Sequence, residues 1–290
     1  MNEGAHKERA VDVPEVILTR IMHKVVRAEI VSAEHGVVAG TEELEKQARA
    51  LGLQVNVHVS SGLEIKRGQA VAEITGNPVQ VVRGEDVLLG VISKVSGVAT
   101  AACEAVRRAG GIKVVCGGWK KMPPKIKKEL RAALKAGGVH PRILPRPFVY
   151  LDKNYIRIFG SLSKALEATR LLPGRAVVAQ LRGEMSPIAE EAITAATHGV
   201  HVLMVDTGRI RDLRAVARAT RKEGFREQVQ IAFAGGLTLS DLDKLRHEDL
   251  DIVDIGRAIL DAPLLDFRLD VIGIGNEGSA DIGKTPKTRL

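Results

Sequence analysis

The second half of the chain alternates short apolar runs with amphipathic segments, and this rhythm constrains the fold more than any other feature. The candidate strands are residues 112–116, 148–151, 176–181, 201–205, 229–233 and 252–255. The candidate helices between most of them are residues 124–136, 161–171, 187–198, 209–223 and 239–247. Apolar strands separated by helices indicate a parallel sheet that is buried on both faces. Six such units predict an open or incomplete barrel of α/β units, with an open doubly wound sheet as the competing fold.

The first third of the chain has a different pattern, which predicts a smaller α/β region. Residues 24–38 and 53–60 favour strands, and residues 40–51 favour a helix capped by Thr41. Residues 84–108 predict a long helix with an interruption near its Ser-Gly pair. Short strands interrupted by glycine connect these segments.

These patterns predict two domains and a tail. We expect an N-terminal domain over residues 1–108 and a barrel over residues 109–263, with residues 264–272 returning to the first domain. Residues 273–290 are polar and rich in glycine, so we expect a poorly ordered tail.

Composition favours a globular protein that binds an anionic small molecule. The formal net charge is +8 while only 3% of residues are aromatic, so nucleic acid is not favoured as a partner. No apolar run approaches the roughly 18–20 residues that cross a bilayer, and the N-terminal segment lacks a signal-peptide pattern. We therefore expect a cytoplasmic protein with no membrane partner. Cys103 and Cys116 are too few for a disulfide framework or a Cys-rich zinc site.

Two glycine-rich segments that follow late strands favour a phosphate site. One contains Gly235 and Gly236, and the other contains Gly256 and Arg257. Backbone N–H groups left accessible by glycine near a helix start bind anions, and barrels commonly bind phosphate at their last two loops. The alternative is that these glycines only turn the chain tightly.

Charged residues near other strand ends extend this candidate site. Asp206 ends an apolar run, where a carboxylate can hold ribose hydroxyls or Mg²⁺, or can simply cap the next turn. Lys120 follows one glycine pair and Arg142 follows another, so we predict that they clamp a pyrophosphate. Trp119, the only tryptophan, either stacks on a planar base or packs between domains. The histidines have no metal-ligand spacing.

The order of these motifs resembles the quinolinate phosphoribosyltransferase (nicotinate-nucleotide pyrophosphorylase) family. SGVAT, GGWKKMPP and GGVHPR stand where that family has SGIAT, DTRKTTPG and GGxNHR, and MVDTG and FAGGLT resemble its MLDN and SGGI. The resemblance covers most of residues 18–272. It implies an N-terminal α/β sandwich-like domain, an open α/β barrel and homodimers or larger oligomers with shared active sites. The implied reaction joins quinolinate to phosphoribosyl pyrophosphate (PRPP) with Mg²⁺, releasing pyrophosphate and carbon dioxide.

The residues implied for the phosphoribosyl half of the substrate match the family. Lys120 stands at the position of its PRPP-contacting lysine, Arg142 at that of the arginine ending its NHR motif, and Asp206, our candidate Mg²⁺ ligand, at that of the ribose-side aspartate. Lys153 belongs to the base-binding half instead, where it lies beside the position of another family lysine, in swapped order or shifted by one. The phosphate loops are implied at Gly235, Gly236, Gly256 and Arg257.

The residues implied for the acceptor half differ from the family. Asp86 and Trp119 replace arginines, Pro141 replaces a histidine, and Asp152 replaces a lysine. Gln180 is the nearest counterpart of a family glutamate. Quinolinate is a dicarboxylate, so losing basic partners and gaining a carboxylate disfavours it as the acceptor.

The predicted function is therefore phosphoribosyl transfer from PRPP to a pyridine-type or other planar base, with Lys120 and Asp206 as the candidate catalytic residues. Two alternatives remain open. The chain could use quinolinate, with Lys121, Lys153 or Arg146 supplying the lost charges. It could also bind a phosphoribosyl ligand without turnover, as a regulator.

Overall fold

The chain forms two compact units in the computed structural model, which describes residues 11–276 and 283–284. One unit contains Met1–Gly97 and Leu264–Leu290, and the other contains Val98–Pro263. The division lies inside the long helix α3 (Pro78–Ala109), eleven residues before the boundary expected at 108/109. The N-terminal unit is therefore discontinuous in sequence.

A five-stranded antiparallel sheet forms the N-terminal unit, with the order β13-β12-β1-β5-β3. Its strands are β1 (Lys24–Ser32), β3 (Gln54–Val57), β5 (Ala70–Gly76), β12 (Phe267–Asn276) and β13 (Gly283–Lys284). The strands β2 (Gly36–Val37) and β4 (Glu64–Ile65) pair separately. The helices are α1 (Val13–Leu18), η1 (Thr19–Ile21), α2 (Thr41–Ala50) and the first part of α3. Because β12 pairs with β1 along its whole length, residues 267–276 return to the N-terminal unit and belong to this sheet.

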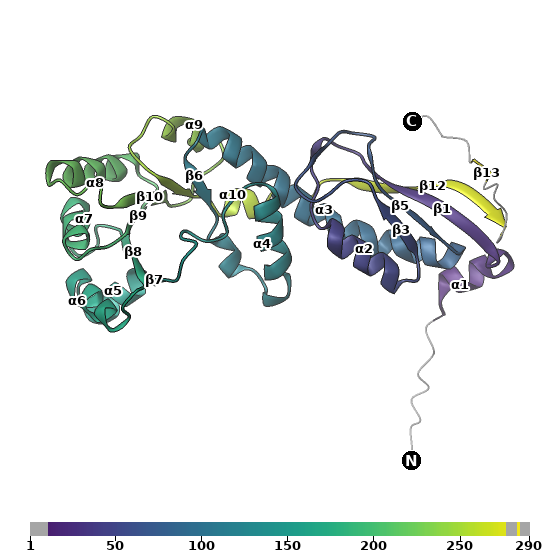
Figure 1. Ribbon diagram of the computed structural model, residues 1–290, viewed down its shortest axis with the longest axis horizontal. Helices are drawn as coiled ribbons and strands as arrows, with labels where there is room; N and C mark the ends of the chain where they lie inside the picture. The colour runs from purple at the N-terminus through teal and green to yellow at the C-terminus, as the bar shows by residue number, and fades with distance from the viewer. Residues whose placement is uncertain (1–10, 277–282, 285–290) are drawn as a thin grey trace, which may run out of the picture. The chain divides into compact units, whose positions relative to one another are not determined.

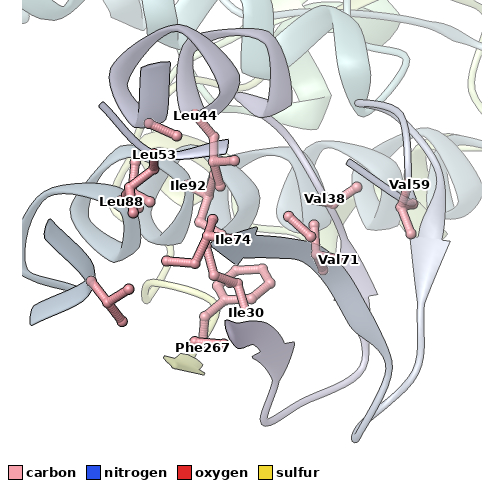
Figure 2. Packing of buried hydrophobic residues seen from close by; sticks show 14 of the residues in the cluster. Ile30, Val38, Leu44, Leu53, Val59, Val71, Ile74, Leu88, Ile92 and Phe267 are labelled. Atoms are coloured by element: carbon pink, nitrogen blue, oxygen red, sulfur yellow. The ribbon is translucent and has the colours of Figure 1, made fainter. Parts of the chain in front are cut away.

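The core of this unit lies between the sheet and two helices. Figure 2 shows Leu44 of α2 and Ile92 of α3 pointing toward Ile74 and Ile30 of the sheet, with Phe267 of β12 beneath them. Alternate strand residues face one side of a sheet, which explains why these positions share one core. The small α/β sandwich-like arrangement expected for this region is confirmed.

Three local expectations in this unit are wrong. Gly40, with a positive φ of 83°, precedes α2 as its N-cap, and the Thr41 hydroxyl instead contacts Ser61 Oγ at 2.9 Å. The helix α3 is not interrupted, because buried Ser96 accepts the Ala39 N–H at 2.9 Å and so satisfies its hydroxyl outside the helix. Residues 273–276 continue β12 and residues 283–284 form β13, while the rest of the expected tail lies outside the described residues.

By length and composition alone, α3 could cross a membrane, contrary to the expectation that no segment approaches this length. An 18-residue window of the helix has a mean hydropathy of 1.5, and 39% of that window is buried inside the protein. Leu88 and Ile92 belong to the N-terminal core, and Ala102 and Ala105 are buried in the second unit. Burial in the two cores therefore accounts for part of the apolar surface of α3.

The second unit contains a six-stranded parallel sheet with the order β6-β11-β10-β9-β8-β7. Its strands are β6 (Lys113–Val115), β7 (Phe148–Leu151), β8 (Ala176–Leu181), β9 (Val202–Asp206), β10 (Gln230–Ala234) and β11 (Ile252–Asp254). Its helices after α3 are η2 (Gly118–Lys121), η3 (Pro124–Ile126), α4 (Lys127–Ala136), α5 (Lys153–Phe159), α6 (Leu162–Ala168), η4 (Thr169–Leu171), α7 (Ile188–Thr197), α8 (Ile210–Lys222), α9 (Asp241–Leu245) and α10 (Arg257–Leu260). Figure 1 shows α5 to α8 on the outer side of strands β7 to β10.

The inner face of this sheet curls around a core, which makes it an incomplete barrel rather than a flat sheet. All six strands contribute residues to one cluster, at alternate positions in β7, β8, β9 and β10, and Ile143 and Leu144 from the segment before β7 join it. Strand β6 is linked to the segment before β7, because Lys113 Nζ donates to the Ile143 carbonyl at 2.7 Å. The expected open α/β barrel is confirmed.

The second glycine pair, Gly137-Gly138, ends α4 and packs on α3. A Cβ atom added at Gly137 would lie 2.3 Å from the Ala99 carbonyl oxygen and 2.5 Å from Ala102 Cβ. This pair, which the sequence analysis noted only because Arg142 follows it, therefore permits close helix packing.

We predict that Gly137→Ala lowers the free energy of unfolding by about 1–3 kcal/mol, because the added methyl overpacks a helix contact. Gly90→Ala is the matched control, since Gly90 lies within α3 and a Cβ atom there meets nothing within 4 Å. That variant should stabilise the protein by about 0.5–1 kcal/mol through helix propensity. Thermal unfolding of both variants measures the difference, and equal shifts in Tm would contradict the packing assignment.

Candidate active site

Two predicted cations lie over consecutive inward-facing aromatic residues of β7. Lys120 Nζ is 5.7 Å from the centre of the Tyr150 ring, and the Arg142 guanidinium is 5.3 Å from the centre of the Phe148 ring. Tyr150 and Phe148 are two residues apart, so their side chains share the inner face of the sheet. The structure therefore brings Lys120 and Arg142, which are 22 positions apart, to the same side of β7.

Asp206 lies at the end of β9, where neighbouring side chains fix one of its carboxylate oxygens. Gln180 Nε2 donates to Asp206 Oδ2, and Arg182 Nη1 is 3.5 Å from the same oxygen. Gln180 is buried, and its Oε1 accepts the backbone N–H of Lys153 at 2.6 Å. Gln180 therefore joins the start of α5 to Asp206. No group among the described residues bonds to Asp206 Oδ1, so this oxygen can accept a ligand.

The loop after β8 is held by a buried glutamate. Glu191 Oε2 accepts the backbone N–H groups of Arg182 at 3.0 Å and Gly183 at 2.9 Å. The Arg182 side chain then reaches the Asp206 carbonyl at 2.9 Å and Glu184 Oε1 at 2.8 Å. Arg182 is thus engaged with groups of the chain and orients the end of β9.

Asp254 ends β11 and holds the turn after β6. Its Oδ1 accepts the Gly117 N–H at 2.9 Å, immediately before η2. Burial is the main reason that the pKa of Asp254 is raised, and the nearby Asp206 adds to the rise. The Gly117 N–H and the positive charges of Lys120 and Lys121 act in the opposite direction. Asp254, Lys120 and Asp206 therefore belong to one electrostatic site.

The Tyr150 hydroxyl lies within the same cluster. Burial raises its pKa well above the usual value, and the charges of Asp206, Asp254 and Asp152 raise it further. Tyr150 consequently stays protonated at neutral pH and offers an O–H donor among three carboxylates.

The two glycine-rich loops lie beside each other, at the ends of the paired strands β10 and β11. Among the described residues, no group of the chain accepts the backbone N–H of Gly235, Gly236 or Gly256. The helices that follow are short, with α9 starting at Asp241 and α10 at Arg257. The anion-binding capacity of this edge therefore comes from free loop amides.

Glycine is required at Gly235 by a close backbone approach. A Cβ atom there would lie 2.2 Å from the Gly208 nitrogen, and its φ of 119° is strained for other residues. The loops after β9 and β10 thus touch through their backbones, which brings Asp206 close to the second glycine loop.

Other predicted residues have structural partners. The Trp119 indole donates to the Pro141 carbonyl at 2.8 Å and the Arg131 guanidinium lies 4.9 Å from its ring, so one ring face is already covered. The Arg257 side chain is 91% exposed and pairs with Asp261, so its contribution to the loop is its backbone. Lys153 is exposed, and only its backbone contacts Gln180.

The replaced family positions differ in their local surroundings. Asp152 caps α5 by accepting the N–H groups of Asn154 and Tyr155, so it has a local structural role. Asp86 is exposed on the part of α3 that belongs to the N-terminal unit. Burial lowers the pKa of His201, and the positive charge of Arg146 lowers it further. His201 precedes β9 at the amino end of the strands, so Arg146 interacts at the edge opposite to Asp206.

Tyr150, Arg182 and Asp254 were not predicted as site residues. Each lies at or near the carboxyl end of a strand, and Tyr150 and Asp254 stand two residues after an inward-facing apolar position. That spacing was visible in the sequence, because Asp254 ends its strand as Asp206 does. A glycine pair is a clearer sequence signal than alternation, which is why Lys120 was predicted and these three residues were not.

The residues present can accommodate Mg²⁺ only as a partner of a phosphorylated ligand. No group of three or more His, Cys, Asp or Glu side chains with suitable geometry occurs among residues 11–276. Mg²⁺ is commonly held by one or two carboxylates together with substrate phosphates and water. The free Oδ1 of Asp206 fits that arrangement.

We predict that Cys116 resists alkylation in the native protein. Burial raises the pKa of its thiol to about 11, and the side chain is fully buried at the end of β6. The reactive thiolate is therefore scarce at neutral pH. Iodoacetamide at pH 7.5, followed by mass spectrometry, should modify the partly exposed Cys103 first and Cys116 only after denaturation. Rapid native labelling of Cys116 would contradict this environment.

Comparison with known proteins covers both units. Residues 15–96 match the quinolinate phosphoribosyl transferase N-terminal domain, and residues 98–270 match its C-terminal domain. A protein of Archaeoglobus fulgidus named probable nicotinate-nucleotide pyrophosphorylase (carboxylating) is 28% identical, over 88% of this chain and 98% of that protein. The nicotinate-nucleotide pyrophosphorylase of Rattus norvegicus is 29% identical, over 83% of this chain and 80% of that protein.

Solved structures of the same name share the fold. The enzyme from Pyrococcus furiosus superimposes with a TM-score of 0.76 at 22% identity, covering 93% of this chain and 74% of that one. The enzyme from Ehrlichia chaffeensis gives a TM-score of 0.77 at 16% identity, covering 88% and 92%. With both domains matched in order, the chain belongs to the quinolinate phosphoribosyltransferase family.

Proposed function

We propose that this protein is a phosphoribosyltransferase that transfers the phosphoribosyl group of PRPP to a planar nitrogen base. In the proposed reaction the bond between C1 of the ribose and pyrophosphate breaks, and a bond from C1 to a ring nitrogen of the base forms. Pyrophosphate leaves with the bonding electrons. Membership of the family and the names of the relatives support this reaction class.

The position of Lys120 is the observation that carries the proposal. Its ammonium lies over the Tyr150 ring and within the electrostatic field of Asp254, at the carboxyl ends of the strands. A leaving pyrophosphate gains charge as the C1 bond breaks, so a lysine fixed beside it stabilises the transition state. Arg142, on the same face of β7, supplies a second cation.

The remaining groups can take the other parts of PRPP. The free amides of Gly235, Gly236 and Gly256 suit the 5′-phosphate, because unpaired N–H groups bind anions. Asp206 Oδ1 suits the ribose hydroxyls or the Mg²⁺ that accompanies pyrophosphate. Gln180 and Arg182 fix the orientation of Asp206.

We infer that the acceptor is not a dianion such as quinolinate. The charges of Asp206, Asp254 and Asp152 all act on the Tyr150 hydroxyl, and this negative field would repel a dianionic acceptor. Arg146 was one candidate to replace the lost charges, but it interacts with His201, at the edge of the sheet opposite to Asp206. Lys121 and Lys153 remain able to serve the alternative, in which quinolinate is used after all.

Two further features remain proposals that follow from family membership. We expect a homodimer or larger oligomer in which neighbouring subunits share active sites. We also expect the protein to act in the cytoplasm, since its proposed substrates are soluble metabolites.

We predict that Lys120→Ala weakens PRPP binding by about 10–100-fold, the effect of losing one charge-assisted contact to a phosphate. Calorimetry with PRPP and Mg²⁺ measures the affinity directly. Lys125→Ala is the matched control, because Lys125 is exposed in η3 of the same basic segment and should leave binding unchanged. Equal affinities of the Lys120 variant and the wild type would place Lys120 outside the site.

A pyrophosphate-release assay across pyridine, purine and pyrimidine bases distinguishes the acceptors. We expect release with PRPP, Mg²⁺ and a neutral or monoanionic planar base, and release at least about tenfold slower with quinolinate because of carboxylate repulsion. Fast release with quinolinate would assign the usual family acceptor. PRPP binding without release on any base would instead support a non-catalytic binding protein.

A further inference from the structure

Asp254 connects the rigid sheet to the turn that carries Lys120. Its backbone is fixed in the sheet, where it pairs with Val115 of β6, and the Ile255 N–H donates to the Val115 carbonyl at 3.0 Å. Its side chain reaches across and accepts the Gly117 N–H at 2.9 Å. Lys120 lies three residues later, and its N–H donates to the Gly117 carbonyl at 3.3 Å. The carboxylate thus acts on the first residue of the turn.

The same turn packs directly on the second phosphate loop. A Cβ atom added at Gly118 would lie 3.0 Å from Gly256 Cα, and one added at Gly256 would lie 3.2 Å from Gly118 Cα. A Cβ atom at Gly117 would lie 2.9 Å from Asp254 Oδ2. Any displacement of Asp254 therefore changes how the Lys120 turn meets the Gly256 loop.

Charge favours a carboxylate in this position over a neutral acceptor. Lys120 and Lys121 are adjacent in one short turn, and both interact favourably with the Asp254 charge. On its other side the turn is held by Trp119, which donates to the Pro141 carbonyl, and by Lys127, which donates to the Lys120 carbonyl at 2.9 Å. Asp254 is thus the side-chain contact on the face of the turn that meets β11.

We propose that Asp254 is a positioning residue, which holds the Lys120 turn against the Gly256 loop so that both bind one PRPP molecule. This inference rests on the proposed function. Asp254 acts through Lys120 in this role and need not touch the substrate. The pyrophosphate end of PRPP would contact Lys120, while its 5′-phosphate would contact the glycine loops, and Asp254 fixes their separation.

The first test follows the turn itself and does not require PRPP. Hydrogen exchange of residues 117–121, measured by mass spectrometry on the full chain, should become at least about tenfold faster in Asp254→Ala, because the Gly117 N–H loses its acceptor. Asp254→Asn keeps an oxygen that can accept this N–H, so its exchange should stay close to that of the wild type. Unchanged exchange in Asp254→Ala would overturn the proposal. The thermal unfolding of each variant shows whether it is folded.

The second test asks whether Asp254 acts through Lys120. We expect Asp254→Ala to weaken PRPP binding about tenfold in the wild-type background and less than about twofold in the Lys120→Ala background. Binding of ribose 5-phosphate, which lacks the pyrophosphate, should change less than about twofold in either background. Independent, additive losses of PRPP affinity, or an equal loss for ribose 5-phosphate, would show a merely structural role and overturn the proposal.

A control variant and the wild type distinguish a failure of the proposed function from a failure of the proposed role of Asp254. Asp243→Asn removes a carboxylate from α9 that pairs with Arg108, and it should change neither exchange nor PRPP affinity. If the wild type does not bind PRPP, the proposed function fails, and the inferred role for this reaction fails with it. Faster exchange in Asp254→Ala would then show only that the carboxylate holds the turn. If PRPP binds normally but the cycle is additive, only the inference about Asp254 fails.

Discussion

The alternation of side chains in the six parallel strands is the constraint on which the site depends. Every second residue points into the barrel, and the parallel register aligns the strand ends at one edge. Most inward positions are apolar, and polar residues occupy the inward positions at several carboxyl ends, where Gln180, Asp206 and Asp254 lie. The core and the site are therefore successive layers of one structure, and a shift in register would displace both.

The aspartates at this edge are bonded mainly to uncharged N–H groups, which leaves the cations available for a ligand. Asp254 is satisfied mainly by a backbone N–H and Asp206 mainly by the amide of Gln180. Lys120 and Arg142 lie on aromatic rings instead of forming close ion pairs with these acids. An aromatic face holds a cation without cancelling its charge, so both remain able to bind an anionic ligand. Cationic groups therefore remain uncancelled at an edge that is rich in aspartate.

The sequence predicted the barrel well because its strands are buried on both faces and appear as uninterrupted apolar runs. The strands β7 and β8 have the predicted bounds, and the remaining four differ by one residue at each affected end. Helix α5 was not predicted, because its apolar residues Ile158 and Phe159 are exposed and follow no amphipathic pattern. The roles of individual residues depended on tertiary contacts. Gly137, for example, is explained by its close approach to Ala99, which the sequence does not reveal.

The single tryptophan has a spectroscopic consequence. Trp119 belongs to the turn that carries Lys120, its indole N–H is bonded to Pro141, and a guanidinium lies over its ring. Because the chain has no other indole, tryptophan emission originates from this one turn, without interference from either core. Trp119 is therefore an intrinsic fluorescent probe of the candidate site, and its emission reports the local polarity and solvation of the turn.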